Sequence, residues 1–454
     1  MLKTIPNTIL DILSLFHQAG YEAVLVGGCV RDFIMQRNLH DYDIATSALP
    51  DETIALLEKH QYHYITIGKA HGTICAITSL GQIEITTYRK EDCYLDHRHP
   101  AHVVFTTNLQ EDLARRDFTM NAIAYDIKQG FIDPYHGYDD IKKKQIKAVG
   151  EPTLRFKEDA LRILRAARFQ CELQFTIEKA TKEALIMDTH LLSYVSSERI
   201  QAEFNRMLLA DYDFTLQLLM DLHILEHILP GYTCIYQHPQ PTPWHQYDIF
   251  THTDVALNHT KRMPLILKLA MVLHDWGKVE CEHIDKTGRA HYKGHAIVSA
   301  KKAKQALLDL HYDNKTIDQV CKLIYYHDHY QKPDKAGLRL FASYFDCDLE
   351  LTKLGLYIQI ADNYGKNLAK VQPELVLLDA CLQQFDEMVI NDEFITRKQL
   401  AINGHDLIAM EIQGKQIKTY LDKAYYHILK YPKDNQKDIL LSYLKETMDK
   451  TKEA

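Results

Sequence analysis

The feature that most limits the fold is a change in hydrophobic pattern about a third of the way along the 454-residue chain. Residues 22–90 alternate short strand-like runs with helix-like runs, and TICAITS (73–79) followed by QIEITTYR (82–89) predicts a β-hairpin. From about residue 152 onward, apolar residues recur at helical spacing. The sequence therefore predicts an α+β protein with an N-terminal sheet domain followed by helical parts.

Composition excludes several classes of protein. The apolar fraction is 46% and the charged fraction 25%, which is typical of a globular chain. No apolar run approaches the ~18 residues of a membrane span, so we expect no membrane association. The nine cysteines form no CxxC pair, which indicates reduced thiols and a cytoplasmic location. The net charge of −8 excludes a basic nucleic-acid coat, although residues 142–172 carry nine Lys or Arg against four acidic residues.

A Gly-Gly turn and two aspartates form the first candidate site. Gly27 and Gly28 follow a strand-like run and open a helix, where the backbone can approach a phosphate. Asp41 and Asp43 lie two residues apart, so on a strand their carboxylates would share one face. Two like charges so placed suit a bound cation, although a solvent-facing strand edge explains them equally well. Glu84 is a candidate third carboxylate, with a solvated outer face as the alternative.

A second candidate site lies in EDALRILRAAR (158–168), where Asp159, Arg162, Arg165 and Arg168 recur every three residues and should form a stripe along one helix. A carboxylate accepts from the exocyclic amino groups of cytosine and adenine, whereas uracil and guanine present a carbonyl there. Asp159 with Arg162 could thus select C and A. A surface ion pair is the alternative interpretation.

Together these segments resemble the nucleotidyltransferase head and neck of bacterial CCA-adding enzymes and poly(A) polymerases. The resemblance covers about 150 residues and lies in GGCVRD (27–32), DYD (41–43), RRDFTMNAIAYD (115–126), IDPYHGYDDI (132–141) and GEPTLRFKEDALRILRAARF (150–169). It implies a polymerase-β-like sheet, two Mg²⁺ ions on Asp41 and Asp43, and nucleotidyl transfer from CTP and ATP to a tRNA 3′ end.

The same resemblance implies roles for individual residues. Gly28, Arg31 and Arg116 would hold the triphosphate, since arginine supplies a fork of donors. Base selection would fall to the Glu-Asp-x-x-Arg motif, and two further arginines would lie near the nucleotide. These are Glu158, Asp159 and Arg162 for the motif, and Arg165 and Arg168 for the two further arginines.

Histidine is concentrated in one segment. Thirteen of the 25 histidines lie within residues 223–329, and imidazole is the commonest metal ligand. The order of six residues resembles the HD phosphohydrolase superfamily: His252, His274, Asp275, His295, His327 and Asp362. The resemblance implies a primary metal on His252, His274, Asp275 and Asp362 and a second ion on His295 and His327, either a divalent transition metal or Mg²⁺. Trp276 departs from the small or aliphatic residue usual in that family, and the other nine clustered histidines are expected to have structural roles.

The resulting division of the chain is a head (1–145), a helical neck (146–240), an HD domain (241–370) and a helical tail (371–454). The expected partners are tRNA, CTP and ATP, and the oligomeric state stays open. An A-adding enzyme shares these motifs. A CC-adding enzyme should lack the flexible loop that residues 91–105 resemble, and a poly(A) polymerase usually carries a basic C-terminal extension that Lys-Thr-Lys-Glu-Ala does not supply. An RNA-binding HD phosphohydrolase with a silent head is the alternative from a different class, and the intact Asp41/Asp43 pair disfavours it.

Overall fold

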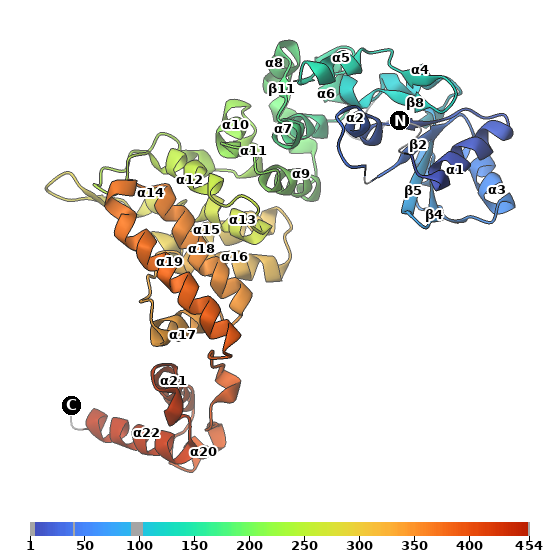
Figure 1. Cartoon of the computed structure of the whole chain (residues 1–454). Coiled ribbons are helices and arrows are strands. Elements are labelled where there is room, and N and C mark those ends of the chain that lie inside the picture. Colours follow the sequence, from blue (N-terminus) through green and yellow to red (C-terminus); the bar gives the residue numbers. More distant parts are fainter. Residues whose placement is uncertain (1–4, 40, 92–102, 453–454) are drawn as a thin grey trace. The chain divides into compact units, whose positions relative to one another are not determined.

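The computed structural model describes residues 5–39, 41–91 and 103–452. The chain divides into two compact units, residues 1–229 and 230–454. Figure 1 shows that the first unit combines a sheet with helices, while the second is almost entirely helical. The α+β fold class predicted from the sequence is confirmed. The four-part division of the chain stays a prediction.

One mixed sheet organises the first unit. Among the described residues, seven strands form it in the order β3-β4-β5-β2-β1-β8-β9. The β2–β5 pair is parallel, and the other neighbouring strands run antiparallel. The predicted hairpin is confirmed as β4 with β5. The strands are β1 (Ala23–Val26), β2 (Asp43–Thr46), β3 (His63–Ile65), β4 (Thr73–Thr78), β5 (Gly81–Thr87), β8 (Ala124–Asp126) and β9 (Gly130–Ile132).

Short helices pack on this sheet. α1 buries an apolar face that comprises Ile9, Ile12, Leu13 and Phe16. α1 and α2 both contact β1, and α3 contacts β4 and β5. A separate two-stranded pair, β6 with β7, flanks residues 92–102, so the core of the expected 91–105 loop lies outside the described residues. The elements are α1 (Asn7–Gln18), α2 (Gly28–Ile34), α3 (Pro50–Lys59), α4 (Leu109–Ala114), α5 (Gly137–Lys142), β6 (Arg89–Glu91) and β7 (Val103–Phe105).

The rest of the first unit is helical, apart from a two-residue parallel pair between β10 and β11. The expected stripe from Asp159 to Arg168 on one helix is wrong at its first residue. α6 ends at Glu158 and α7 begins at Leu161, so Asp159 is extended between them, with φ −138° and ψ 105°. The elements are β10 (Gln145–Ile146), α6 (Pro152–Glu158), α7 (Leu161–Leu173), β11 (Thr176–Ile177), α8 (Lys179–Asp188), α9 (Ser197–Leu209), α10 (Thr215–Asp221) and α11 (Leu225–Ile228).

The second unit is a set of packed helices with one short hairpin, β12 with β13. α18 and α19 pack along each other, and α12, α13 and α16 also contact α18 (Figure 1). The elements are α12 (Ile249–Asn258), α13 (Leu265–Leu273), α14 (Lys278–Cys281), β12 (His283–Ile284), β13 (Ala290–His291), α15 (His295–Asp309), α16 (Asn314–Tyr326), α17 (Lys335–Tyr344), α18 (Leu349–Tyr364) and α19 (Leu368–Ile390).

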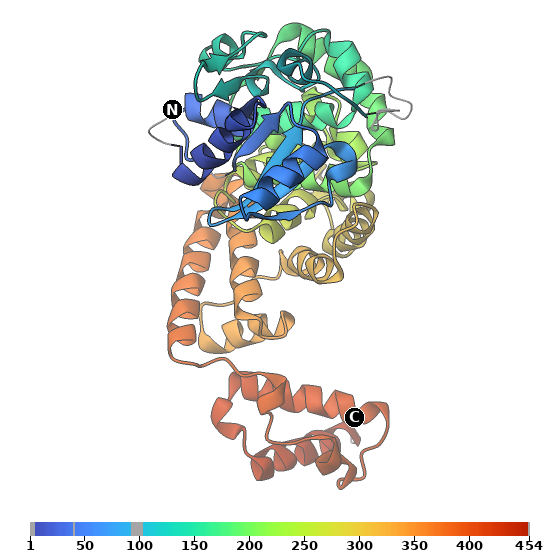
Figure 2. The same ribbon diagram turned by 90° about the vertical axis from the view of Figure 1, so that its right-hand side faces the viewer.

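The last helices of the chain build a core of their own, drawn in red in Figure 2. Leu407, Ile428 and Leu440 are fully buried within it. Within the described residues, none of the helices combines the length and apolar character that crossing a membrane requires. The elements are α20 (Gly404–Ile408), α21 (Lys415–Lys430) and α22 (Lys437–Lys452).

Candidate active site and metal centre

A polar pocket of about 640 Å³ opens in the first unit. The turn between β1 and α2, the start of β2, and helices α7 and α9 all contribute lining side chains. Gly27 has φ +73°, and a Cβ at this residue would approach the Arg116 guanidinium to 3.1 Å. Glycine is therefore required at this turn both by its backbone conformation and by the closeness of Arg116. Gly28 follows at the start of α2 and also lines the pocket.

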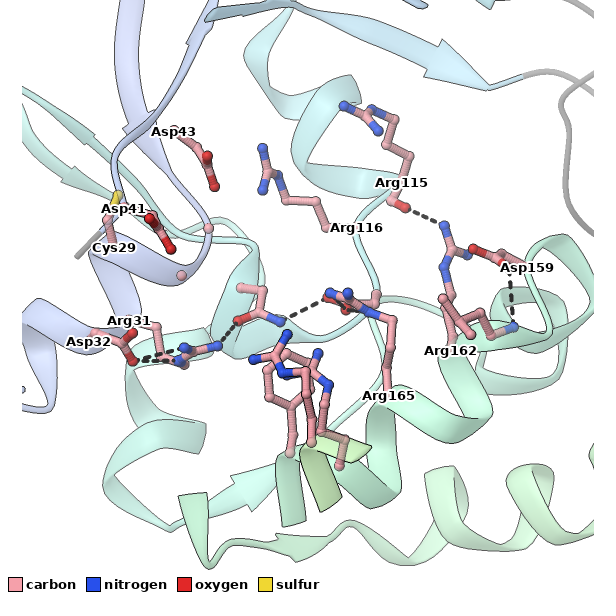
Figure 3. Close-up of a pocket in the computed structure, with 18 of the residues that line it drawn as sticks. Cys29, Arg31, Asp32, Asp41, Asp43, Arg115, Arg116, Asp159, Arg162 and Arg165 are labelled. Atoms are coloured by element: carbon pink, nitrogen blue, oxygen red, sulfur yellow. Dashed lines mark hydrogen bonds and ion pairs between the residues drawn. The ribbon is translucent and has the colours of Figure 1, made fainter. Parts of the chain in front are cut away.

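Two aspartates face this pocket beside Arg116 (Figure 3). The expectation that both lie on one strand is wrong for Asp41, because β2 begins at Asp43. Asp43 lies opposite Glu84 of β5 in the sheet, while Glu84 is not among the pocket-lining residues. The loss of water around Asp43 and the charges of Glu84 and Asp41 raise its pKa, although Arg116 opposes the shift. A cation held by the aspartates would relieve this repulsion.

A chain of hydrogen bonds crosses the floor of the pocket. Arg31 donates from Nη1 to Asn121 at 2.8 Å, and Asn121 donates to Asp117 at 3.0 Å. The other oxygen of Asp117 accepts from Arg165 at 2.8 and 2.5 Å. Burial opposes ionisation of Asp117, but Arg165 and Asn121 lower its pKa to about 2. Asp32 also accepts from the Arg31 guanidinium at 2.8 Å, so the orientation of Arg31 is fixed from two sides.

Arg162 is held in place by neighbouring acceptors. Its guanidinium donates to the Glu158 carboxylate at 2.6 Å and to the carbonyl of Arg115 at 2.7 Å, a bond drawn in Figure 3. Arg155 contributes a carbonyl acceptor at 3.0 Å and its own ion pair with Glu158. Glu158 therefore orients Arg162 and Arg155, while Arg162 itself lines the pocket.

Asp159 is anchored by a helix that lies forty residues away in the sequence. One of its oxygens accepts from the Leu161 backbone N–H at 3.1 Å, and the other accepts from Arg199 of α9, also at 3.1 Å. Asp159 and Arg199 both line the pocket. Nη1 of Arg199 and Nε of Arg116 are buried and have no hydrogen-bond partner, so both can donate to a ligand.

Arg168 forms a different kind of wall. Its guanidinium pairs with Glu203 at 2.5 Å and Glu172 at 2.7 Å, and it lies 4.0 Å from the centre of the Phe169 ring. Only 2% of its side chain is exposed. Because its charge is already matched by two carboxylates, Arg168 can shape the pocket wall and fix α7 against α9.

The second unit gathers a buried group of four potential metal ligands: His252 of α12, His274 and Asp275 at the end of α13, and Asp362 of α18. Nε2 of His252 lies 3.0 Å from Asp362 and 3.3 Å from Asp275. Nε2 of His274 lies 3.2 Å from Asp275 and 3.5 Å from Asp362. The edge of a tetrahedron with metal–ligand bonds of about 2.0–2.2 Å measures roughly 3.3–3.6 Å, so these spacings suit one divalent cation.

Backbone carbonyls orient the imidazoles of this centre. Nδ1 of His252 bonds the Gly365 carbonyl at 2.9 Å, and Nδ1 of His274 bonds the Met271 carbonyl at 2.7 Å. A proton on each Nδ1 leaves Nε2 with a free lone pair directed at the carboxylates, which is the arrangement of a metal-binding histidine. Both Nε2 atoms and Oδ1 of Asp275 are buried without a hydrogen-bond partner. The donor set therefore fits a metal ion.

A second group of three shares Asp275 with the first. His295 Nε2 lies 3.3 Å from Oδ1 of Asp275 and 3.2 Å from Nε2 of His327. Their Nδ1 atoms bond the carbonyls of Tyr292 and Ile324, which again leaves Nε2 facing the centre. Asp275 thus presents one oxygen to each group, as a carboxylate bridging two ions would.

Two lysines that the sequence analysis did not single out complete the centre. Lys278 bonds Oδ2 of Asp275 at 2.6 Å, and Lys366 bonds Oδ2 of Asp362 at 2.6 Å. Burial opposes ionisation of both carboxylates, but the surrounding cations hold their pKa values well below the usual range. The same carboxylates raise the pKa of His274 to about 9 against the effect of burial. The centre therefore favours positive charge.

Three regions of the chain match protein-family models. Residues 23–147 match the poly A polymerase head domain, residues 174–235 the RNA and SrmB- binding site of polymerase A, and residues 295–444 the tRNA nucleotidyltransferase domain 2. Together the matches support one family, that of poly(A) polymerases and tRNA nucleotidyltransferases. The head sheet and the polar pocket lie within the first two of these regions and the segment that joins them.

Named relatives agree with this family. The CCA-adding enzyme of Streptococcus pyogenes serotype M5 is 45% identical over 214 residues, which is 46% of this chain and 52% of that protein. The chain thus spans about half the length of the curated relatives it matches. The Bacillus stearothermophilus CCA-adding enzyme in complex with CTP is 26% identical, with a TM-score of 0.71 over 98% of both chains. The Thermotoga maritima CCA-adding enzyme complexed with tRNA shares the fold, with a TM-score of 0.59, 18% identity and coverage of 98% and 97%.

The structure brings most of the family motif residues together. Asp41, Asp43, Arg116, Asp159 and Arg162 line one pocket, which adjacent motifs could not establish by themselves. The sequence analysis missed Asp117 and Asn121, although both lie within the quoted RRDFTMNAIAYD motif, and it assigned no ligand-facing role to the helix that carries Arg199. The six predicted metal ligands converge. The ring of Trp276 packs 5.3 Å from that of Tyr232 and is 4% exposed.

Proposed function

We propose that the chain adds C, C and A to the 3′ end of tRNA, using CTP and ATP without a nucleic-acid template. One observation carries the proposal: a single pocket holds the aspartate pair, the arginines suited to a triphosphate, and the Asp159–Arg162 pair suited to a base. The CCA-adding enzymes among its relatives and the family head domain support the same activity.

In this proposal Asp41 and Asp43 hold Mg²⁺, which would activate the attacking 3′-hydroxyl and stabilise the leaving pyrophosphate. Burial raises the pKa of Asp43, and the nearby charges of Glu84 and Asp41 raise it further, so a divalent cation held by this donor set would stabilise the ionised carboxylates. Arg116 donates to the triphosphate beside Gly28, and Arg31 holds the pocket floor through Asn121. Glu84 adds negative charge next to Asp43 from the neighbouring strand.

Base selection is assigned to Asp159 and Arg162. The Asp159 carboxylate accepts from the amino group of cytosine or adenine, and Arg162 donates to the adjacent ring nitrogen or carbonyl. Glu158 orients Arg162, while Arg165 and Arg168 are braced by Asp117 and Glu203 and shape the wall. A carbonyl in place of the amino group would face a carboxylate and would be rejected.

The test is primer extension on tRNA that ends at the discriminator base, in C or in CC, with labelled CTP and ATP. Addition of C, C and A is the expected result, and Asp43→Asn should abolish it. Asp51→Asn on the exposed start of α3 is the matched control and should leave it intact. Addition of A alone would replace the proposal with an A-adding enzyme, and a long A tail on unstructured RNA would replace it with a poly(A) polymerase.

We propose further that the second unit is an HD-type phosphohydrolase centre. The seven inward-facing donor atoms of His252, His274, Asp275, Asp362, His295 and His327 support two divalent cations, a transition metal or Mg²⁺. A hydroxide generated at such a centre hydrolyses a phosphate ester. The alternative of a hydrolase with a silent head would require that the head incorporates no nucleotide.

Metal analysis and hydrolysis of a 2′,3′-cyclic phosphate test the centre. Bound Ni²⁺, Mn²⁺, Mg²⁺ or Co²⁺ and the hydrolysis should both vanish in Asp275→Asn, while the exposed Asp309→Asn should behave as wild type. Metal binding without hydrolysis of any phosphate ester would leave a structural centre. A cytoplasmic location, favoured by the absence of CxxC pairs, stays a prediction.

A further inference from the structure

A second cavity borders the metal centre of the second unit. Its volume is about 480 Å³, within the range of pockets for small ligands. Two of its lining residues contact metal ligands: the His245 ring lies 5.0 Å from the His252 ring, and Lys366 bonds Asp362. One end of this cavity, which we name the side pocket, therefore adjoins the candidate hydrolytic centre.

The side pocket concentrates unsatisfied polar atoms. Oγ1 of Thr242, Nδ1 of His245, Nε of Arg289 and Oε2 of Glu374 are all buried without a hydrogen-bond partner, and all four residues line it. Buried polar atoms are costly unless they are paired, so four in one cavity indicate a polar ligand. They comprise a cationic donor, an anionic acceptor, a hydroxyl and an imidazole, which is more varied than an inorganic ion requires.

The rest of the lining is aromatic and apolar. Trp244 is 37% exposed, and the Arg289 guanidinium lies 4.4 Å from the centre of its ring. Val371 and Leu377 of α19 line the same pocket. An exposed indole beside a guanidinium offers a stacking surface for a planar heterocycle, and such stacking is indifferent to the identity of the base.

We propose that the side pocket binds the nucleoside part of a phosphate ester, with an amino-bearing base, cytosine or adenine, stacked on Trp244. Glu374 accepts from the amino group, Arg289 donates to the ring, and the phosphate lies toward Lys366 and the metal ligands. The inference rests on the proposed phosphohydrolase centre and names its substrate class, a cytidine or adenosine monophosphate. Glu374 would then select an amino-bearing base in the second unit, as proposed for Asp159 in the first.

Tryptophan fluorescence tests binding independently of hydrolysis. The chain contains two tryptophans, Trp244 and Trp276, and neither lines the polar pocket of the first unit. The full chain is treated with EDTA and titrated with CMP, AMP and UMP. CMP and AMP should quench the tryptophan fluorescence to a saturating level. UMP should bind at least about tenfold more weakly than CMP, because its carbonyl would face the Glu374 carboxylate.

Variants locate the binding. Glu374→Gln should abolish the preference for CMP over UMP, and Arg289→Gln should weaken CMP about tenfold. The matched control Glu350→Gln, on the exposed start of α18, should titrate as wild type. Trp244→Phe should remove the quenching while CMP binding persists by calorimetry. The dinucleoside phosphate CpC is added as a competitor of CMP. Displacement of CMP by CpC indicates that the side pocket accepts an RNA 3′ end, and no displacement indicates a free mononucleotide.

Two results with the wild-type chain would overturn the proposed role of the side pocket: the absence of quenching by CMP and AMP, or equal affinity for UMP. Binding that Glu374→Gln and Arg289→Gln leave unchanged would overturn it as well. The metal content of Glu374→Gln should equal that of wild type. Selective binding of CMP without hydrolysis of a phosphate ester would refute only the proposed phosphohydrolase activity. Hydrolysis without a preference for CMP and AMP over UMP would refute only the proposed nucleoside binding in the side pocket.

Discussion

The two candidate centres hold carboxylates in opposite ways. In the first unit, Asp41 and Asp43 line an open pocket, and the loss of water around Asp43 together with the charges of Glu84 and Asp41 raises its pKa. In the second, Asp275 and Asp362 are buried, each is bonded by a lysine, and their pKa values are depressed. An open site can leave its charges unbalanced until substrate and cation arrive. A buried site must balance its charges within the fold, because unpaired buried charge is too costly.

Removing Asp275 should therefore damage the fold as well as the centre. Asp275→Ala leaves Lys278 and His274 buried without their carboxylate, and breaking a buried pair costs about 3–5 kcal/mol. Urea denaturation should show this loss together with loss of metal. Asp309→Ala on the surface of α15 is the control. Wild-type stability in Asp275→Ala would contradict the description of a charge-balanced buried centre.

Removing the charge of Asp43 should instead damage activity without lowering stability. Asp43→Asn should lower nucleotide incorporation by about 10³-fold while its unfolding free energy stays equal or rises. The sign follows from the raised pKa: ionisation of Asp43 disfavours the fold, so stability is lost as pH rises through its folded pKa. The stability advantage of the variant should thus grow from acid toward neutral pH. A destabilised but active variant would reverse the contrast between the centres.

Asp117 lies in the open pocket but behaves like the buried centre. Its pKa of about 2 lies below the ordinary 3.8, which corresponds to about 2 kcal/mol of stability at neutral pH. Because the folded pKa is depressed, this stability is present above about pH 4 and is lost as pH falls through 2. The difference between wild type and Asp117→Asn should shrink over that interval in denaturation at several pH values. The exposed Asp139→Asn should show no such trend.

The smallest effect should come from Arg199. Arg199→Lys keeps the positive charge but loses the planar guanidinium that holds Asp159 in place. We expect the binding free energy of the correct base to weaken by about 1 kcal/mol, the contribution of one hydrogen bond. We expect the KM for CTP and ATP to rise a fewfold, with misincorporation of UTP, while kcat changes less. Arg37→Lys, at an exposed residue, is the control. Unchanged selectivity would leave Arg199 a merely structural residue.

How much could be predicted without the structure depends on sequence separation. The β4–β5 hairpin was predictable because alternating strand residues and the turn between them act within a few positions of the chain. The placement of Asp159 on a helix failed because a local break between α6 and α7 leaves the three-residue spacing unchanged. Arg199 and Lys366 were missed because a single arginine or lysine most often faces solvent.

The sequence by itself determined the inventory: the paired aspartates, the arginine series, the six candidate metal ligands and the order of sheet and helices. Only the tertiary structure decided their partners. Arg31 donates a hydrogen bond to Asn121, ninety residues away in the sequence. His252 of α12 lies beside Asp362 of α18. It also formed the side pocket from Thr242, Arg289 and Glu374, which share no motif. Such contacts depend on how side chains fill the space between packed elements, and periodicity along the chain carries no record of that packing.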